Sequence, residues 1–300
     1  MAEGVLRVAQ LNAGSLLEPH WDERRQAIVA WLEHLAPDVV CLQEIWQDAS
    51  GANTAGWIVD QMPDAGWHWR FGGAPFDASV WPDPEMRFGS AILSRWPIDD
   101  HAYHRLPVVA GIDPFVEHVP WELLHARTAG LDVFSTHLAP APEHGLHRAR
   151  QVLAIDDHIH DVRGDLDTVV PFGPVREAMP PILCGDFNAE PDSDEIRFLC
   201  SLAPLDGRTT GYQDAWRVAG DGPGYTQDWR TNPIAAAMNV HRKRIDYVFV
   251  GDPFLRRGGA GRVVEAELAF DASLTGGVCS DHTGLVVDIL WPQRPADQRS

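Results

Sequence analysis

Short runs of apolar residues, rich in β-branched and aromatic types, recur along the chain and predict strands. The runs cover residues 5–11, 39–43, 90–93, 123–127, 131–136, 181–184, 245–250, 263–269 and 285–290. Gly- and Pro-rich stretches interrupt this pattern at residues 51–84, 164–180 and 220–233. We expect these stretches to form large loops at one edge of the molecule.

Three other stretches have apolar positions at helical spacing and predict helices over residues 23–36, 143–160 and 194–202. In the first, Ile28, Leu32 and Leu35 fall on one face, and Pro37 follows its end. The predicted helices are interspersed among a larger number of strands. Because no charged or low-complexity linker and no fixed-period repeat divides the chain, we expect one layered α/β domain over residues 1–300.

Polar side chains that can bind a metal ion or move a proton occur where several predicted strands begin or end. They are Asn12, Glu44, His137, Asp186, Asn188, Asp246, Asp281 and His282. Asp186 and Asn188 are two residues apart in an extended segment, so their side chains point to the same face. This arrangement suits holding a water molecule and removing its proton, although Gly-Asp-x-Asn also forms ordinary turns that end a strand.

The other residues have structural alternatives as well. These are a turn at Asn12, the start of solvent at Glu44, a core or rim histidine at His137, an ion pair between Asp246 and Arg244, and a cap at residues 280–282. However, the recurrence of polar residues at the ends of separate strands favours one shared site. We expect it at the carboxyl edge of a sheet, where α/β proteins generally place their chemistry.

The residue types in this set indicate the chemistry. The hard oxygen donors, which suit Mg²⁺ or Mn²⁺ better than zinc, are Asn12, Glu44, Asp186, Asn188 and Asp281. No Ser-His-Asp order and no Cys-His pairing occurs at comparable positions. A phosphoester is the natural substrate for such a set with two histidines, because hydrolysis of monoesters needs accelerations of up to ~10²¹. A lone general base contributes only ~10²–10⁴, so charge neutralisation by a cation and an imidazolium is also expected.

The charge balance narrows the choice of substrate. The chain has 24 basic and 43 acidic residues, a formal net charge of −19. This argues against a protein that tracks long DNA or RNA, because such binders need a basic footprint, but it does not exclude a small basic cleft. The one dense basic run, residues 241–244, comes just before Asp246. It predicts either a rim that grips a second phosphate or a solvated loop.

The chain has no stretch of about 18 uninterrupted apolar residues and no pattern of a secretory signal at its start. Its cysteines are widely spaced and lack a paired metal-binding pattern; they are Cys41, Cys184, Cys200 and Cys279. Buried free thiols are therefore expected rather than disulfides or a zinc site. Together these features favour a soluble cytoplasmic protein.

Seven short motifs, taken in order, cover nearly the whole chain. They are Leu11-Asn12, Leu42-Gln43-Glu44, the segment 89–95, Ser135-Thr136-His137-Leu138, Gly185-Asp186-Phe187-Asn188, the segment 244–248 and Ser280-Asp281-His282. In this order the chain resembles the magnesium-dependent endonuclease/exonuclease/phosphatase superfamily. That superfamily includes pancreatic-type deoxyribonucleases, abasic-site endonucleases, neutral sphingomyelinases and inositol polyphosphate phosphatases.

The resemblance implies an α/β fold of four layers, α/β/β/α, with two mixed β-sheets packed face to face and helices outside. It also implies a divalent cation, Mg²⁺ or Mn²⁺. Glu44 would be the principal metal ligand, with Asn12 and Asp281 nearby.

The resemblance implies catalytic roles as well. Asp186 would orient or deprotonate the attacking water, assisted by Asn188. His282 would contact the scissile phosphate and would be held by Asp246, because a carboxylate fixes a tautomer or stabilises imidazolium. His137 would be a second contact to the phosphate or leaving group, where abasic endonucleases carry a tyrosine. This departure makes an abasic-site activity less expected.

For the substrate, the acidic balance favours a small or lipid-derived phosphoester over a nucleic acid. A DNA or RNA endonuclease or exonuclease of the same superfamily is the alternative. A non-catalytic binding module is more remote, because every catalytic position is filled. Five tryptophans could stack a base or line a lipid groove, but we expect them mainly in the core: Trp46, Trp57, Trp67, Trp69 and Trp81. The oligomeric state is left open.

Overall fold

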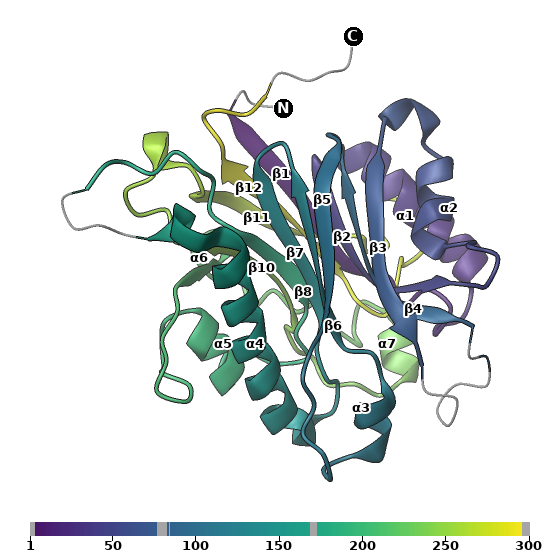
Figure 1. Ribbon diagram of the computed structural model, residues 1–300. Helices are drawn as coiled ribbons and strands as arrows, with labels where there is room; N and C mark the ends of the chain where they lie inside the picture. The colour runs from purple at the N-terminus through teal and green to yellow at the C-terminus, as the bar shows by residue number, and fades with distance from the viewer. Residues whose placement is uncertain (1–3, 77–82, 84, 169–172, 296–300) are drawn as a thin grey trace.

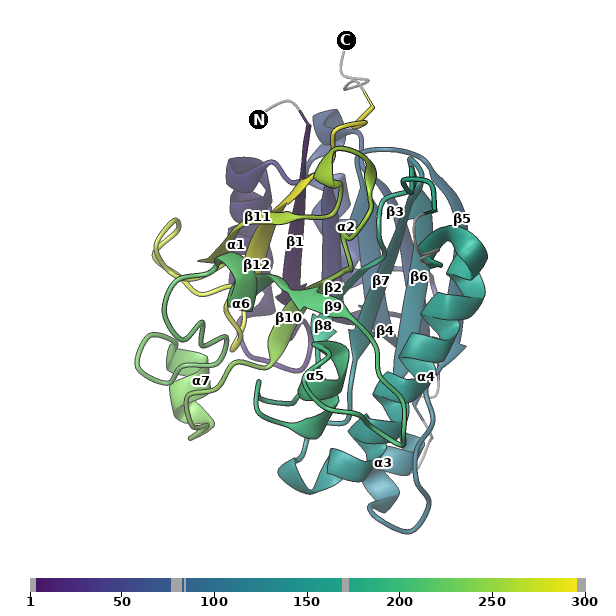
Figure 2. The ribbon, with the colours of Figure 1, turned by 90° about the vertical axis from the view of Figure 1, so that its left-hand side faces the viewer.

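The computed structural model describes residues 4–76, 83, 85–168 and 173–295. Within these residues, two six-stranded β-sheets face each other (Figures 1 and 2). The first sheet contains, in spatial order, β11 (Val263–Ala269), β12 (Gly284–Leu290), β1 (Val5–Asn12), β2 (Val39–Gln47), β4 (Arg87–Ser94) and β3 (His68–Pro75). The second contains β5 (Ile98–Arg105), β6 (Glu122–Thr128), β7 (Leu131–His137), β8 (Ile182–Asp186), β10 (Asp246–Gly251) and β9 (Tyr212–Asp214).

Both sheets are mixed, because β1 pairs with β2 and β7 pairs with β8 in parallel while the other neighbouring strands are antiparallel. The α-helices are α1 (Trp21–Leu35), α2 (Thr54–Asp60), α3 (Pro114–His118), α4 (Gly145–Arg163), α5 (Asp194–Leu199), α6 (Ala215–Ala219) and α7 (Pro233–Ala237). Short 3₁₀ turns are η1 (Pro63–Ala65), η2 (Pro142–His144), η3 (Gly164–Asp167) and η4 (Arg257–Gly259).

Strand β2 shows why the predicted strands are nearly continuous apolar runs. Successive side chains of a strand point to opposite faces. Val39 and Cys41 therefore join the cluster between the two sheets, whereas Val40 and Leu42 join the cluster beneath α1 and α2. Both faces are buried, so neither face needs polar residues.

The helices cover the outer faces of the sheets. Ile28 and Leu32 of α1 pack on the first sheet, and Val152 and Ile155 of α4 pack on the second. Figure 1 shows α1 and α2 on one side of the paired sheets and α4 and α5 on the other. The structure thus has the predicted four layers, α/β/β/α.

The expectation of a loop over residues 51–84 was wrong for much of that stretch, which contains α2 and β3. Gly72 and Gly73 in β3 reflect close packing. A Cβ on Gly72 would lie 2.8 Å from Leu124 Cδ1 in the facing sheet, and one on Gly73 would lie 2.7 Å from the Phe88 carbonyl oxygen. Glycine within a strand can mark such close approach instead of a turn.

The remaining differences between the predicted and the observed elements concern edge strands, short helices and the end of one helix. The pattern also missed β5 and β9, which occupy the two edges of the second sheet, and the short helices α3, α6 and α7. Helix α5 ends at Leu199 rather than at residue 202, since Ser201 has a φ of 61°. In the described part of the chain, no helix combines the length and apolarity needed to cross a membrane. All four cysteines are free thiols; Cys41, Cys184 and Cys279 are buried, as predicted, whereas Cys200 is only partly buried.

Candidate functional site

The predicted site residues meet at the end of the sheets where β1, β2, β7 and β8 finish. Because each of these pairs is parallel, the carboxyl ends of its strands lie at the same edge. The register places His137 opposite Asp186, and antiparallel β10 places Asp246 opposite Asp186 on the other side. Three of the predicted residues are thus neighbours across three adjacent strands.

The segment at the end of β8 forms the turn that the sequence offered as an alternative, and it also carries the predicted pair of polar side chains. Asn188 N donates to Asp186 Oδ1 over 2.8 Å, and Asn188 has a φ of 49°, which asparagine tolerates better than most residues. Gly185 is required before them, because a Cβ there would lie 2.1 Å from the Thr136 carbonyl oxygen. The turn therefore directs both side chains into the site.

The second carboxylate oxygen of Asp186 is the centre of the cluster. Asn12 Nδ2 donates to Asp186 Oδ2 over 3.1 Å, and His137 Nε2 lies 3.5 Å and His282 Nε2 3.7 Å from the same atom. Asn188 Nδ2 also lies 3.2 Å from His137 Nε2. The sequence separation of these residues is large, so only the fold brings them together.

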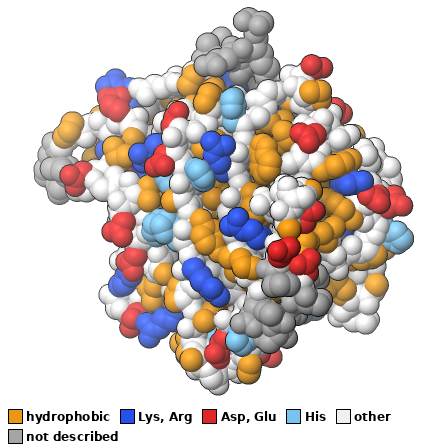
Figure 3. Space-filling model, turned by 45° about the vertical axis from the view of Figure 1, so that its right-hand side comes forward, with side chains coloured by type: hydrophobic (Ala, Val, Ile, Leu, Met, Phe, Trp, Pro, Cys, Tyr) orange, Lys and Arg blue, Asp and Glu red, His pale blue; other side chains and the backbone are white. Residues whose placement is uncertain are grey.

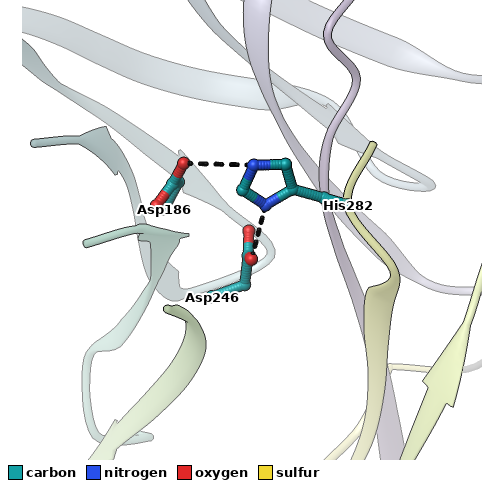
Figure 4. A group of neighbouring side chains, drawn as sticks. All are labelled: Asp186, Asp246 and His282. Carbon is teal, nitrogen blue, oxygen red and sulfur yellow. Dashed lines mark hydrogen bonds and ion pairs between the residues drawn. The ribbon is translucent and has the colours of Figure 1, made fainter. Parts of the chain in front are cut away.

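His282 is held by Asp246 (Figure 4). Its Nδ1 lies 2.7 Å from Asp246 Oδ2, and its Nε2 points toward Asp186. Gln10 Nε2 donates to the other oxygen of Asp246 over 3.1 Å. The alternative pairing of Asp246 with Arg244 is wrong, because Arg244 makes two hydrogen bonds to Asp214 at 3.0 and 2.8 Å.

Burial and neighbouring charges shift the proton affinities of this group. Burial by itself would lower the pKa of His282, but the carboxylates of Asp246, Asp281 and Asp186 outweigh it and raise the pKa well above its ordinary value. The pKa of Asp186 is raised, first by burial and then by the charge of Asp246. The arrangement favours imidazolium at His282 beside a carboxyl group that binds protons more readily than usual.

Glu44 enters the cleft at an irregularity of β2. The register between β2 and β4 shifts between Leu42 and Ile45, and Glu44 has a φ of 57°. Such a bulge redirects a side chain. Glu44 Oε1 accepts a hydrogen bond of 3.0 Å from Asn12 Nδ2, and burial raises its pKa. Asn12 Oδ1 is bound to Gly14 N at 3.1 Å, so Asn12 acts here as a donor to two carboxylates.

Asp281 has partners that the sequence analysis missed. Gln227 Nε2 lies 2.7 Å from Asp281 Oδ2 and 2.9 Å from His282 Nε2, and Asp281 N donates to Glu18 Oε2 over 2.9 Å. Burial and the adjoining Asp281 raise the pKa of Glu18 to about 9. Gln227 lies in a stretch predicted as loop, and Glu18 stands in an irregular segment, so no periodicity marks either residue.

Arg24 is a second missed residue, with a scaffolding role. Its side chain is buried and donates to the backbone carbonyls of Ala13, Ser15 and Cys279 at 2.7–2.9 Å, which joins the segments that carry Asn12 and Asp281. Helical spacing places Arg24 on the same face as Ile28 of α1. That spacing was the available signal for its burial.

The basic run at residues 241–244 is largely neutralised by acidic neighbours. His241 pairs with Glu190, and Arg242 pairs with Asp228 at 2.8 Å. Arg244 is bound to Asp214, as described above. Lys243 alone of this run lines the cleft. The solvated-loop alternative does not describe Arg242 and Arg244, because both pair with buried aspartates.

The tryptophans follow the core interpretation. Trp46 and Trp67 are buried, whereas Trp57 and Trp69 are partly buried against the cluster beneath α1 and α2. Trp81 lies outside the described residues.

A cleft of about 420 Å³ contains most of the predicted residues. Those that line it are Glu44, His137, Asp186, Asn188, Asp281 and His282. Asn12 and Asp246 contact members of this set from behind. Ligating atoms of Asp186, Asp246 and His282 lie within 4.8 Å of one another, close enough to hold a metal ion.

The donor set also fits a hard divalent cation at Glu44 and Asp281. Both offer carboxylate oxygens to the same cleft. Within the described part of the chain, no Lys or Arg forms an ion pair with Glu44, Asp186 or Asp281. The imidazolium of His282 lies near Asp186 and Asp281 and offsets part of the negative charge of the cleft. A divalent cation would offset the remainder, because uncompensated charges are costly away from water.

Comparison with solved structures gives the same fold at low sequence identity. An endonuclease/exonuclease/phosphatase from Beutenbergia cavernae has a TM-score of 0.66 at 23% identity, with 96% of this chain and 72% of that chain covered. The human Nocturnin catalytic domain has a TM-score of 0.66 at 21% identity, covering 96% and 94%. D. rerio TDP2, complexed with a single-strand DNA product, has a TM-score of 0.66 at 19% identity, covering 96% and 99%.

A search among curated proteins found no match. The model of the Endonuclease/Exonuclease/phosphatase family matches residues 9–282, which include every predicted site residue from Asn12 to His282. This match confirms the resemblance found in the sequence motifs. The chain belongs to the endonuclease/exonuclease/phosphatase family.

Proposed function

We propose that this chain is a divalent-metal-dependent phosphoester hydrolase, a phosphodiesterase or phosphatase that acts on a small or lipid-derived phosphoester. One observation carries the proposal. Glu44, Asp186, Asn188 and His282 converge in one cleft, and Asp246 holds His282 from behind. The pKa values of the carboxyl groups of Asp186 and Glu44 are raised. Family membership supports hydrolysis of a phosphoester bond as the reaction.

Glu44 and Asp281 would hold Mg²⁺ or Mn²⁺, with Asn12 beside them. A cation bound there supplies neutralisation of the charge on the phosphoryl oxygens. Asn12 positions the carboxylate of Glu44 through its amide hydrogen bond. Glu18 supports Asp281 from the backbone side.

The chain's own groups would carry out the proton and charge movements. Asp186 orients the attacking water and takes its proton, while Asn188 helps to position it. His282, kept as imidazolium by Asp246, donates a hydrogen bond to the scissile phosphate. His137 contacts a phosphate or leaving-group oxygen from the other side of Asp186.

Hydrolysis of bis-p-nitrophenyl phosphate tests this function. Activity should disappear with EDTA and return with Mg²⁺ or Mn²⁺, and Asp186→Ala and His282→Ala should each remove most turnover. Asp64→Ala is a matched control, because Asp64 is exposed on η1 and away from the cleft. Turnover that is indifferent to chelation would contradict the metal assignment, and near-normal rates in either site variant would contradict that residue's role.

A nucleic-acid substrate is the second candidate, favoured by the fold shared with TDP2 bound to a DNA product. On the face shown in Figure 3, however, Lys and Arg side chains are scattered among acidic and hydrophobic ones, without a continuous basic track. Plasmid nicking that falls steeply as salt rises would support this candidate. Absence of nicking at any salt concentration would leave the small-molecule or lipid substrate.

We also propose that residues 1–300 act as a single domain. Strands from both ends of the chain support this, since β1 lies between β12 and β2 in one sheet. Limited proteolysis should then give no stable fragment that excludes either end of that sheet.

A further inference from the structure

The cleft has an apolar lining next to His137. Val119 and Trp121, which follow α3, and Phe88 from β4 all line it. The ring centroid of His137 lies 5.4 Å from that of Trp121 and 6.2 Å from that of Phe88. A substrate whose phosphate reaches His137 therefore places its neighbouring atoms against hydrocarbon.

Three large apolar side chains stand exposed at the mouth of the same cleft. Leu17 is 47%, Phe115 52% and Met238 56% exposed, and all three line it. Single exposed apolar residues are ordinary on a protein surface. A group of them around a concave site that also carries convergent polar residues is typical of a binding pocket.

The segment that carries Phe115 is held in place before any ligand binds. Asp113 Oδ1 accepts a hydrogen bond from Phe115 N at 2.9 Å, and Asp113 Oδ2 lies 3.0 Å from His144 Nε2 at the start of α4. Trp121 Nε1 donates to the Val116 carbonyl over 2.9 Å. A preformed apolar surface of this kind loses little entropy on binding.

The lining of the cleft has few cationic side chains that could bind a chain of several phosphates. Lys243 is the only Lys or Arg that lines it among the described residues. The neighbouring arginines, Arg242 and Arg244, are paired with aspartates. Together with the net charge of −19, this leaves cationic contacts for one phosphate group beside a largely apolar surface.

We propose that the substrate is a phosphoester with a single phosphate and an apolar ester arm, alkyl or aryl, which lies between Trp121 and Phe115. This inference rests on the proposed function, because it takes the site residues as the place where the phosphate binds. It adds the chemical class of the group attached to the phosphate and assigns Phe115 and Met238 as residues that determine specificity.

A series of alkylphosphonates from methyl to octyl tests the proposal, because each carries one phosphorus group, one apolar arm and no cleavable ester. Binding to the full chain is measured by calorimetry with Mg²⁺ present and at concentrations that form no micelles. Burial of each added methylene should tighten the Kd by about three- to fourfold until the cleft is filled. Inorganic phosphate and thymidine 5′-monophosphate serve as probes without an arm and with a polar arm.

Phe115→Ser and Met238→Gln should each flatten the dependence of Kd on chain length. Phe254→Ser is the matched control, because Phe254 is 57% exposed but lies in the loop after β10, at the other end of that strand from Asp246. It should leave the dependence unchanged. Two variants at exposed positions are used so that a folding defect in one cannot decide the result.

Chain-length-independent binding by the wild-type protein would overturn the proposal, as would tighter binding of thymidine 5′-monophosphate than of hexylphosphonate. A chain-length dependence equal in Phe115→Ser, Met238→Gln and the wild type would overturn the assigned surface. Hydrolysis of bis-p-nitrophenyl phosphate by the same preparations reports separately on the proposed function. Metal-dependent hydrolysis with a flat binding series therefore rejects the apolar arm alone.

Discussion

Strand β7 has a charged cluster at each end, and the two ends treat buried carboxylates differently. At its start, Asp132 is bound by Arg127 at 2.8 Å and by Arg163 at 2.7 Å. At its end, His137 lies beside Asp186, with which no Arg or Lys pairs in the described part of the chain. The two ends are roughly 17 Å apart, at about 3.3 Å per residue.

The pKa values follow this difference. Burial alone would raise the pKa of Asp132, but His125, Arg127 and Arg163 hold it well below its ordinary value. At the other end burial raises the pKa of Asp186. The first cluster is complete within the protein and stabilises the fold, whereas the second has an unbalanced negative charge that a bound cation would offset. Both clusters are buried, so burial does not distinguish them. What distinguishes the candidate site from the structural cluster is that, within the described residues, its carboxylates are not neutralised by arginines.

The largest expected effect is on catalysis, and it should appear at only one end of β7. Asp186→Asn should lower kcat/KM by at least ~10², because it removes a group proposed to act on the attacking water. Asp132→Asn, assayed at a temperature where it is folded, should retain the rate per folded molecule. Equal losses of kcat/KM in the two variants would erase the functional difference between the ends.

The free energy of unfolding should be affected mainly at the other end of β7, at Asp132. Asp132→Ala leaves Arg163 buried without this partner, and breaking a buried pair from one side costs about 3–5 kcal/mol. Urea unfolding followed by circular dichroism measures this change. A loss below ~1 kcal/mol would contradict the structural role of the cluster.

The pH dependence sharpens the same contrast. Because the folded-state pKa of Asp132 is depressed, its contribution to stability is present above its unfolded pKa of about 3.9 and is lost as the pH falls through the folded value. The wild type should therefore lose stability more steeply than Asp132→Asn below about pH 4. Parallel acid-unfolding curves of the two proteins would argue against this assignment.

Glu44→Gln should have a smaller effect on stability, opposite in sign. The folded-state pKa of Glu44 is raised. The contribution of Glu44 to the stability of the protein is therefore greatest at low pH and is lost as the pH rises through the folded-state pKa. Without metal, the variant should melt about 2–4 °C higher at pH 8, the shift that corresponds to ~1 kcal/mol. Wild-type protein should gain about 2.7 kcal/mol at a Mg²⁺ concentration of 100 Kd, and the variant should gain much less. An equal gain would place the ion elsewhere.

The smallest effect is expected at an exposed pair. Arg150 and Asp206 lie 3.1 Å apart with side chains 52% and 63% exposed. Asp206→Asn should change the free energy of unfolding by less than ~0.5 kcal/mol, because solvent screens such pairs. A change as large as that of Asp132→Ala would mean that burial does not determine how much stability is lost when an ion pair is broken.

Much of the site could be predicted from the sequence because its residues stand at strand ends. Asp186 and Asn188 follow a clear apolar run, and His137 and Glu44 end two others. Strand β3 was missed because Gly72 and Gly73 resemble loop residues. A Cβ on Gly72 would lie against Leu124 of the facing sheet, and one on Gly73 would lie against Phe71 and the Phe88 carbonyl of its own sheet. A glycine required by close packing in a strand can be told from a glycine in a loop only when the distances to neighbouring strands are known.

The supporting residues were missed for a different reason. Gln227 contacts Asp281 and His282 from a segment without periodicity, and Arg24 binds carbonyls of two segments far apart in the chain. For Gln227 no local pattern distinguishes a polar residue with buried partners from one that faces solvent, and for Arg24 helical spacing indicates burial but not the carbonyl groups that it binds. The same holds for Arg163 and Asp132, which are 31 residues apart.

The sequence by itself determined nine of the twelve strands that the structure describes, the polar residues at their ends and the family, because periodicity and ordered motifs are properties of the chain alone. Only the tertiary structure decided which buried carboxylates pair with arginines, that Arg244 pairs with Asp214 and not with Asp246, and that Phe88 and Trp121 line the cleft beside His137. The physical reason is that charge compensation and cleft shape depend on distances of a few ångströms between segments, which sequence order does not encode locally.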